Sequence, residues 1–208
     1  MWHQFLIVAG IHLLAVMSPG PDFAMVMRNS LIYSRRTGVL AAAGLACGIA
    51  LHVTYSLLGI GLVISRSILL FNAIKWIGAF YLIFIGVKSL FTKVPKNMES
   101  TIKVEKKDLS TFQAVRMGFL TNALNPKATL FFLALFTTII SRTTPLGYKM
   151  LYGLEMVIAT FAWFTFVALI LSHRRVNNVF SRIKHRIEKI FGVVLVALGI
   201  KVALGSHK

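Results

Sequence analysis

Apolar segments of about 20 residues or more recur along this chain of 208 residues, with short basic connections between them. A helix of about 20 apolar residues spans the hydrocarbon core of a bilayer. Only 14% of the residues are charged, whereas a soluble domain has about 25%. The sequence therefore predicts an all-α membrane protein that forms a single membrane domain over residues 1–208.

The apolar segments predict six transmembrane helices, which we place at residues 3–27, 38–64, 68–91, 114–140, 146–172 and 187–205. One polar segment, residues 92–113, divides them into two groups of three. We expect this segment to be a cytoplasmic loop between repeat one (1–92) and repeat two (114–208).

The formal net charge of +17 comes from basic residues that lie between the apolar segments. Lysine and arginine gather in the cytoplasmic loops of membrane proteins, so topology explains this charge and we expect no nucleic-acid partner. Most of the 23 basic residues follow the first, third and fifth expected helices. These connections therefore face the cytoplasm, and both termini are predicted to lie outside.

Two segments of the chain share one pattern. "KWIGAFYLIFIGVK" (75–88) and "KIFGVVLVALGIK" (189–201) both read lysine, two residues, glycine, an apolar run, glycine, one residue and lysine. Each segment closes a group of three expected helices. Because three is odd, the second group enters the bilayer from the opposite side, which predicts the inverted repeat typical of secondary transporters.

Prolines interrupt the first and the fourth expected helix. "SPGPD" places Pro19 and Pro21 in the first, and "NPK" places Pro126 in the fourth. Proline removes a backbone donor and breaks the helix, and in a membrane such backbone is tolerated where protein or a wet cavity covers it. Matching breaks in two inverted halves predict a substrate site between them.

"SPGPDFAMVMRNSLIYSRRTGVLAAAGLACGIALH" (18–52) and "GFLTNALNPKATLFFLALF" (118–136) resemble the two hallmark stretches of the lysine exporter/homoserine–threonine resistance family of bacterial amino-acid exporters. "AWFTFVA" (162–168) is similar to its threonine-exporter branch. The resemblance implies an exporter of neutral amino acids such as threonine or homoserine in the bacterial inner membrane, driven by the proton gradient. "LFTTII" (135–140) departs from the Pro-Gln-Phe-like element of many members.

An amino acid is a zwitterion, so its site needs an anion or carbonyls for the ammonium and a cation or a helix N-terminus for the carboxylate. Asp22 and Lys127 each follow a break and supply these charges, although the two side chains can also pair with each other. Asparagines flank both breaks, and the resemblance favours a role for them at the site. The predicted substrate-binding residues are Pro19, Gly20, Pro21, Asp22, Asn29, Asn122, Asn125, Pro126 and Lys127.

Proton coupling requires a group within the membrane that gains and loses a proton. Asp22 is the first candidate, and Glu155 and His52 lie within the fifth and second expected helices. A partly hydrated glutamate and a neutral hydrogen-bonding histidine are the alternative readings of the last two.

Other functions have less support in the sequence. A metal-cation exporter would need clustered ligands, but the six histidines are scattered and Cys47 is the single cysteine, so we expect no metal site and no cofactor. An intramembrane enzyme would need a paired-carboxylate, metal or nucleophile site, which the pattern does not show. The pair Gly44 and Gly48 predicts close helix packing, within one chain in preference to a homodimer.

Overall fold

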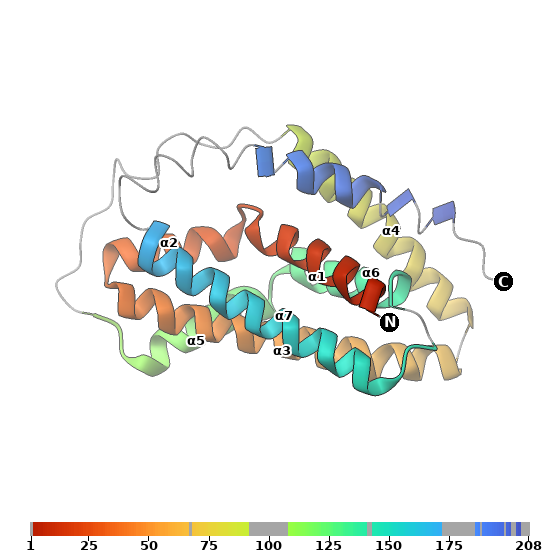
Figure 1. Cartoon of the computed structure of the whole chain (residues 1–208), viewed down its shortest axis with the longest axis horizontal. Coiled ribbons are helices and arrows are strands. Elements are labelled where there is room, and N and C mark those ends of the chain that lie inside the picture. The colour runs from red at the N-terminus through yellow and green to blue at the C-terminus, as the bar shows by residue number, and fades with distance from the viewer. Residues whose placement is uncertain are drawn as a thin grey trace.

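The computed structural model describes residues 2–66, 68–91, 108–140 and 143–171, together with 186–187, 189–197, 199–200 and 203–204 near the C-terminus. All regular elements in these ranges are helices (Figure 1), which confirms the predicted all-α fold. Most of the predicted loop at 92–113 lies outside the described residues. The described parts of the sixth predicted helix are helical.

The helices match the predicted segments, with one division in each proline-containing segment. They are α1 (Trp2–Met17), α2 (Pro21–Ile32), α3 (Arg35–Arg66), α4 (Ile68–Phe91), α5 (Thr111–Ala123), α6 (Pro126–Thr138) and α7 (Leu146–Phe166), which continues into a π-helical segment, η1 (Val167–Leu171). The first predicted helix is thus α1 plus α2, bent by 53°, and the fourth is α5 plus α6, bent by 58°.

Length and composition identify the membrane-crossing helices among the described residues. α3 and α7 each contain a segment long and apolar enough to cross a bilayer, and each bent pair satisfies the same criterion as a broken span. The described residues therefore contain two such spans, or up to four when the bent pairs are counted. The chain is a multi-pass membrane protein, and the arrangement of six spans stays a prediction.

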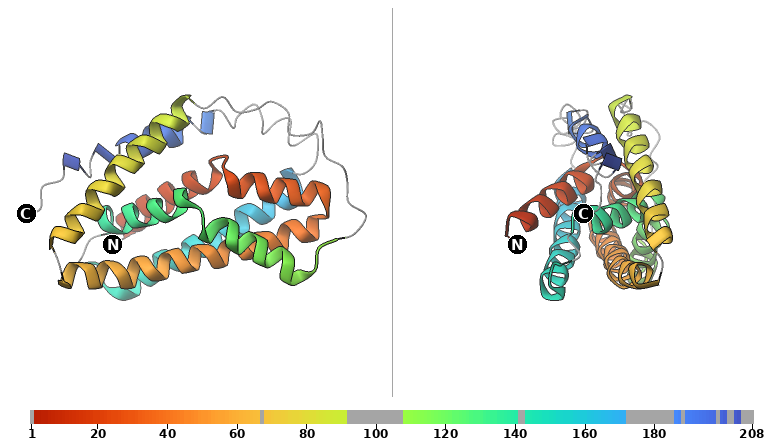
Figure 2. Two further views of the ribbon diagram at one scale, coloured as in Figure 1. Left: turned by 180° about the vertical axis from the view of Figure 1, so that it is seen from behind. Right: turned by 90° about the vertical axis from the view of Figure 1, so that its right-hand side faces the viewer.

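The two bent pairs run in opposite directions along the long axis of the molecule (Figure 1). α3 lies against α5, α7 and α2, and Figure 2 shows it alongside the broken pair α5–α6. Gly44 permits a close approach, because a Cβ atom there would lie 2.1 Å from the carbonyl oxygen of Val115 on α5. The small-residue face of α3 is therefore used for packing within the chain, as the sequence favoured.

The two segments with the repeated glycine pattern pack against each other in antiparallel fashion. A Cβ atom at Gly86 would lie 2.7 Å from the carbonyl oxygen of Gly192, and one at Gly199 would lie 2.8 Å from that of Ala79. Small residues allow such close backbone contact between membrane helices. The opposed directions agree with the predicted inverted repeat, which itself stays a prediction.

Polar side chains join the helices at the two ends of the bundle. At the end where α1 begins, Gln4 donates 2.7 Å to the carbonyl oxygen of Ile139 and accepts from the hydroxyls of Thr144 and Tyr152. At the other end, Asp108 accepts hydrogen bonds from the hydroxyls of Ser34 and Thr37, which lie at the start of α3. These contacts connect α1 to the α6–α7 region and the segment before α5 to α3.

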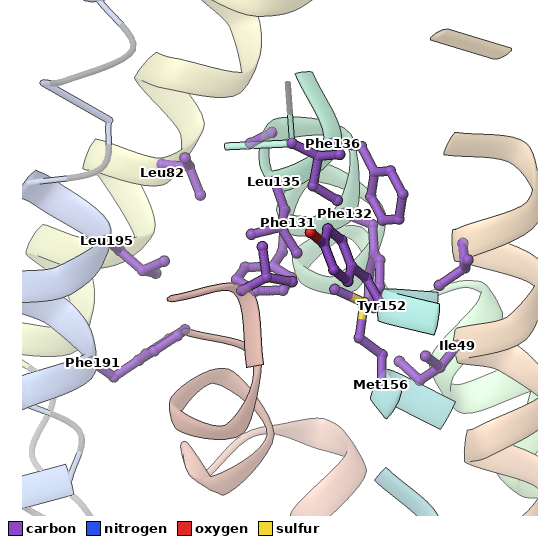
Figure 3. Close-up of a cluster of buried hydrophobic side chains, with 14 residues drawn as sticks. Ile49, Leu82, Phe131, Phe132, Leu135, Phe136, Tyr152, Met156, Phe191 and Leu195 are labelled. Atoms are coloured by element: carbon purple, nitrogen blue, oxygen red, sulfur yellow. The ribbon is translucent and has the colours of Figure 1, made fainter. Parts of the chain in front are cut away.

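The main buried apolar cluster lies where α6 meets α1, α3, α4, α7 and the C-terminal helical residues. Figure 3 shows Leu82 of α4 with Phe191 and Leu195 of the C-terminal residues on one side, and Phe131 and Phe132 of α6 facing them. This cluster holds α6, and therefore the second helix break, in place.

Candidate functional site

The first break is formed by local sequence. Gly20 precedes α2 in an extended conformation, and Pro21 occupies the first position of the helix, where a missing N–H group costs nothing. The carbonyl oxygen of Gly20 accepts a 2.9 Å hydrogen bond from Ala24 N–H and begins the new helix. Asp22 therefore lies in the first turn of α2, where the helix dipole favours a negative charge.

The second break has a similar construction. Asn125 caps α6, because its Oδ1 atom accepts a 3.0 Å hydrogen bond from the N–H group of Lys127, and Pro126 occupies the first helical position. The N–H group of Asn125 donates 2.9 Å to the carbonyl oxygen of Asn122 at the end of α5. The chain thus restarts a helix just before Lys127.

The charged residue of each break is bound by the other break. The carboxylate of Asp22 accepts hydrogen bonds from the side-chain amides of Asn122, at 2.8 Å, and Asn125, at 3.2 Å. In return, the ammonium group of Lys127 donates 3.1 Å to the hydroxyl of Ser18, at the end of α1. It also lies 4.5 Å from the centre of the Phe191 ring, a distance that allows a cation–π interaction.

A cavity with about 660 Å³ of empty volume, including the space at its opening, lies beside the two breaks. Residues of α1 to α7 and of the C-terminal helical segment line this cavity. They include Phe131, Phe132 and Phe191, which Figure 3 labels. The predicted site residues that line it are Gly20, Pro21, Asp22, Asn122, Asn125 and Lys127. An anion and a cation therefore share one largely apolar cavity.

Gly48 of α3 supports the position of Asn122. A Cβ atom at residue 48 would lie 2.6 Å from the Oδ1 atom and 2.8 Å from the Cβ atom of Asn122. Asn122 is buried, so its side chain has little room to move aside. The second glycine of the GxxxG pair thus places a donor to Asp22.

The other predicted substrate-binding residues do not line the cavity. Pro19 and Pro126 shape the breaks but are absent from the walls. Asn29 is fully buried, and its amide donates 3.1 Å hydrogen bonds to the sulfur atoms of Met25 and Met117. This asparagine therefore joins α2 to α5.

The two further proton-coupling candidates also lie away from the cavity walls. His52 is buried beneath the second break, with its Nε2 atom 3.0 Å from the carbonyl oxygen of Asn122 and its Nδ1 atom 2.6 Å from the Tyr55 hydroxyl. The imidazole thus adds a side-chain partner to a carbonyl at the end of α5, next to the second break. Glu155 of α7 is half-buried, and its Oε2 atom has no hydrogen-bond partner among the described residues.

Several lining residues were not singled out by sequence reasoning. They include Ser18, His12, Thr160, Tyr81 and Phe191. Ser18 adjoins the Pro-Gly-Pro motif, so its position was a usable signal. The others lie on helices that are apolar on all sides, where the sequence does not indicate which face points inward.

Metal ligands do not gather in the described part of the chain. No group of three or more His, Cys, Asp or Glu side chains there is placed to hold an ion. The polar side chains that line the cavity supply one carboxylate, one ammonium group, the imidazole of His12, and amide and hydroxyl groups.

Comparisons with known proteins identify the family of this chain. Residues 13–206 match the family described as LysE type translocator. The chain is 32% identical to the uncharacterized membrane protein YrhP of Bacillus subtilis, over 97% of this chain and 99% of that protein. It is 28% identical to the threonine efflux protein of Escherichia coli K12, over 96% of this chain and 97% of that protein.

A third relative is the threonine efflux protein of Salmonella typhimurium, which is 28% identical over 98% of this chain and 99% of that protein. No solved structure matches the chain. The family match covers nearly the whole sequence and includes both helix breaks. The chain therefore belongs to the LysE type translocator family.

Proposed function

We propose that this protein exports neutral amino acids of the threonine or homoserine type from the cytoplasm, in exchange for protons. The observation that carries the proposal is the placement of Asp22 and Lys127, from two separate helix breaks, in one cavity. Membership of a translocator family favours transport over an enzymatic reaction. The threonine efflux relatives support the choice of substrate class.

The substrate ammonium would bind the carboxylate of Asp22, and the substrate carboxylate would bind Lys127 and the N–H groups at the start of α6. Each contact is a charge-assisted hydrogen bond, with a net value of about 1.5–3 kcal/mol. In the structure, neutral groups bind both charges. The amides of Asn122 and Asn125 bind Asp22. The hydroxyl of Ser18 binds Lys127. A zwitterion can therefore replace neutral partners with charged ones at both ends.

A proton and the substrate ammonium would compete for Asp22. Protonation removes the negative charge that holds the ammonium, so a proton entering from outside releases the substrate on that side. His52 contacts the carbonyl oxygen of Asn122, the residue that donates to Asp22, and would act on the site through that contact. We assign Glu155 a secondary role in proton movement, because it is half-buried in α7 and outside the cavity walls.

The proposed setting is the bacterial inner membrane, with both termini outside and the basic connections in the cytoplasm. The α2–α3 and α4–α5 connections then face the cytoplasm, and the Gln4 contacts lie at the outer end of the bundle. Movement of one half against the other would expose the two breaks to each side in turn.

Proteoliposomes with an imposed pH gradient test this proposal. Wild-type protein is expected to drive uptake of labelled threonine, and Asp22→Asn is expected to abolish gradient-driven uptake. Lys127→Met should weaken threonine binding. At saturating threonine, this variant should still show uptake that depends on the pH gradient. Gly10→Ala serves as the comparison and should retain activity, because a Cβ atom at residue 10 of α1 would meet no atom within 4 Å. Normal gradient-driven flux through Asp22→Asn would disprove the role given to that carboxylate.

A further inference from the structure

The polar side chains of the cavity fall into two groups. One group surrounds the breaks and consists of Ser18, Asp22, Asn122, Asn125 and Lys127. The second group is His12 of α1 and Thr160 of α7, which are only 1% and 0% exposed. The binding of a substrate backbone, as proposed above, uses the first group and leaves the second without a function.

His12 and Thr160 use only part of their hydrogen-bonding capacity. The Nε2 atom of His12 lies 3.4 Å from the Thr160 hydroxyl, which is long for a hydrogen bond. The Nδ1 atom of His12 has no partner among the described residues. Since buried polar groups are nearly always hydrogen-bonded, this pair is suited to a further polar partner.

The surroundings of the pair are apolar. The ring of Phe132 lies edge to face with His12, at a centroid distance of 6.0 Å. Phe131, Phe164 and Ile49 are further lining residues. A side chain with a short hydrocarbon part and one hydroxyl would match such a place, whereas a second charge would be left uncompensated there.

The position along α1 also fits a short substrate. His12 precedes Ser18 by six residues, a rise of about 9 Å along a helix. Ser18 binds the ammonium group of Lys127, so a carboxylate held by Lys127 lies near that level of the helix. The Lys127 ammonium group and the His12–Thr160 pair therefore line neighbouring parts of one cavity, where one short substrate can contact both.

We infer that His12 and Thr160 form the side-chain subsite of this transporter and select amino acids that carry a side-chain hydroxyl. This inference rests on the proposed function, because it assigns the part of the same cavity that receives the substrate side chain. The pair donates to and accepts from the substrate hydroxyl, and the apolar walls contact the methyl or methylene groups.

Threonine and valine provide the test, because they have the same shape and differ in one hydroxyl. Initial rates for each labelled amino acid are measured in proteoliposomes, and the ratio of their kcat/KM values is compared between variants. Thr160→Val is expected to lower the threonine-to-valine ratio about tenfold, the effect of one hydrogen bond. His12→Phe should act in the same direction, and His12→Gln should restore part of the preference.

Thr165→Val is the matched control, since Thr165 is on the same helix but does not line the cavity. Its ratio is expected to equal that of the wild type. An unchanged ratio in Thr160→Val, or an equal fall in both rates, would overturn the subsite while amino-acid transport stands. Wild-type protein that transports neither amino acid would overturn the proposed function and the subsite together.

Discussion

The side-chain amide of Asn122 donates a 2.8 Å hydrogen bond to the carboxylate of Asp22, across the contact between the two broken helix pairs. The carbonyl oxygen of the same residue lies 3.0 Å from the imidazole of His52 on α3. Gly48 leaves the space that Asn122 occupies. One residue of α5 therefore connects α2, α3 and the second break, and its contacts can be tested separately from transport.

Replacement of Asn122 by leucine removes a donor to a buried carboxylate without a large change in volume. We expect a loss of about 1–3 kcal/mol in the free energy of unfolding, because the carboxylate keeps its desolvation cost. Thermal or denaturant unfolding in detergent measures the effect. The same substitution in an Asp22→Asn background should cost less, since a neutral amide needs its donors less. Equal costs in the two backgrounds would show that the hydrogen bond is not the cause.

Gly48→Ala introduces a methyl group where only 2.6 Å separates the new Cβ atom from the Oδ1 atom of Asn122. We expect destabilisation of about 1–3 kcal/mol from this overpacking, together with reduced threonine uptake. Gly10→Ala is the control, because a Cβ atom at residue 10 of α1 would meet no atom within 4 Å. That variant should be as stable as the wild type, or more stable by about 0.5–1 kcal/mol. Similar behaviour of the two variants would contradict the close contact.

Gln4→Leu removes the partner of three groups at one end of the bundle, namely the Ile139 carbonyl and the Thr144 and Tyr152 hydroxyls. Thr144 and Tyr152 are buried, so we expect a loss of about 1–3 kcal/mol in unfolding free energy. Tyr152→Phe removes the longest of these contacts, 3.3 Å, and should cost about 0.5–1.5 kcal/mol. A larger cost for Tyr152→Phe than for Gln4→Leu would show that Gln4 does not organise this end.

Asp108 predicts a pH dependence of stability. Hydrogen bonds from the hydroxyls of Ser34 and Thr37 hold the pKa of Asp108 below its ordinary value of 3.8. A depressed carboxyl pKa stabilises the folded state above that ordinary value, and the contribution disappears as the pH falls through the folded-state pKa. The difference in melting temperature between the wild type and Asp108→Asn should therefore be constant near neutral pH and shrink below pH 3.8. A difference that grows on acidification would contradict the assignment.

Local sequence predicted the elements of this fold well, for direct physical reasons. Apolar runs and their lengths place the helices in the bilayer, so α4 begins and ends where the sequence indicated. Proline removes a backbone donor and interrupts a helix, so the breaks before α2 and α6 were predicted from the prolines of the two motifs. Asp22 and Lys127 were identified in the same way, because a charged side chain within an apolar membrane segment is energetically costly and therefore indicates a function.

The partners of these residues were beyond the reach of the sequence. Nothing in the order of residues indicates that Asp22 binds Asn122, or that Lys127 binds Ser18 and contacts Phe191. The sequence also grouped Asn29 with the site, whereas its amide bonds two methionine sulfur atoms. A residue that flanks a break in the sequence does not necessarily direct its side chain toward the cavity.

The sequence by itself determined that the chain is helical, membrane-embedded and broken at two proline motifs, because apolar length and proline chemistry act within a few residues. Only the tertiary structure decided which side chains share the cavity, including His12 and Thr160. Membrane helices that are apolar on all sides carry no mark of their inward face. Their rotation and crossing are decided by glycine contacts and buried hydrogen bonds between segments far apart in the chain.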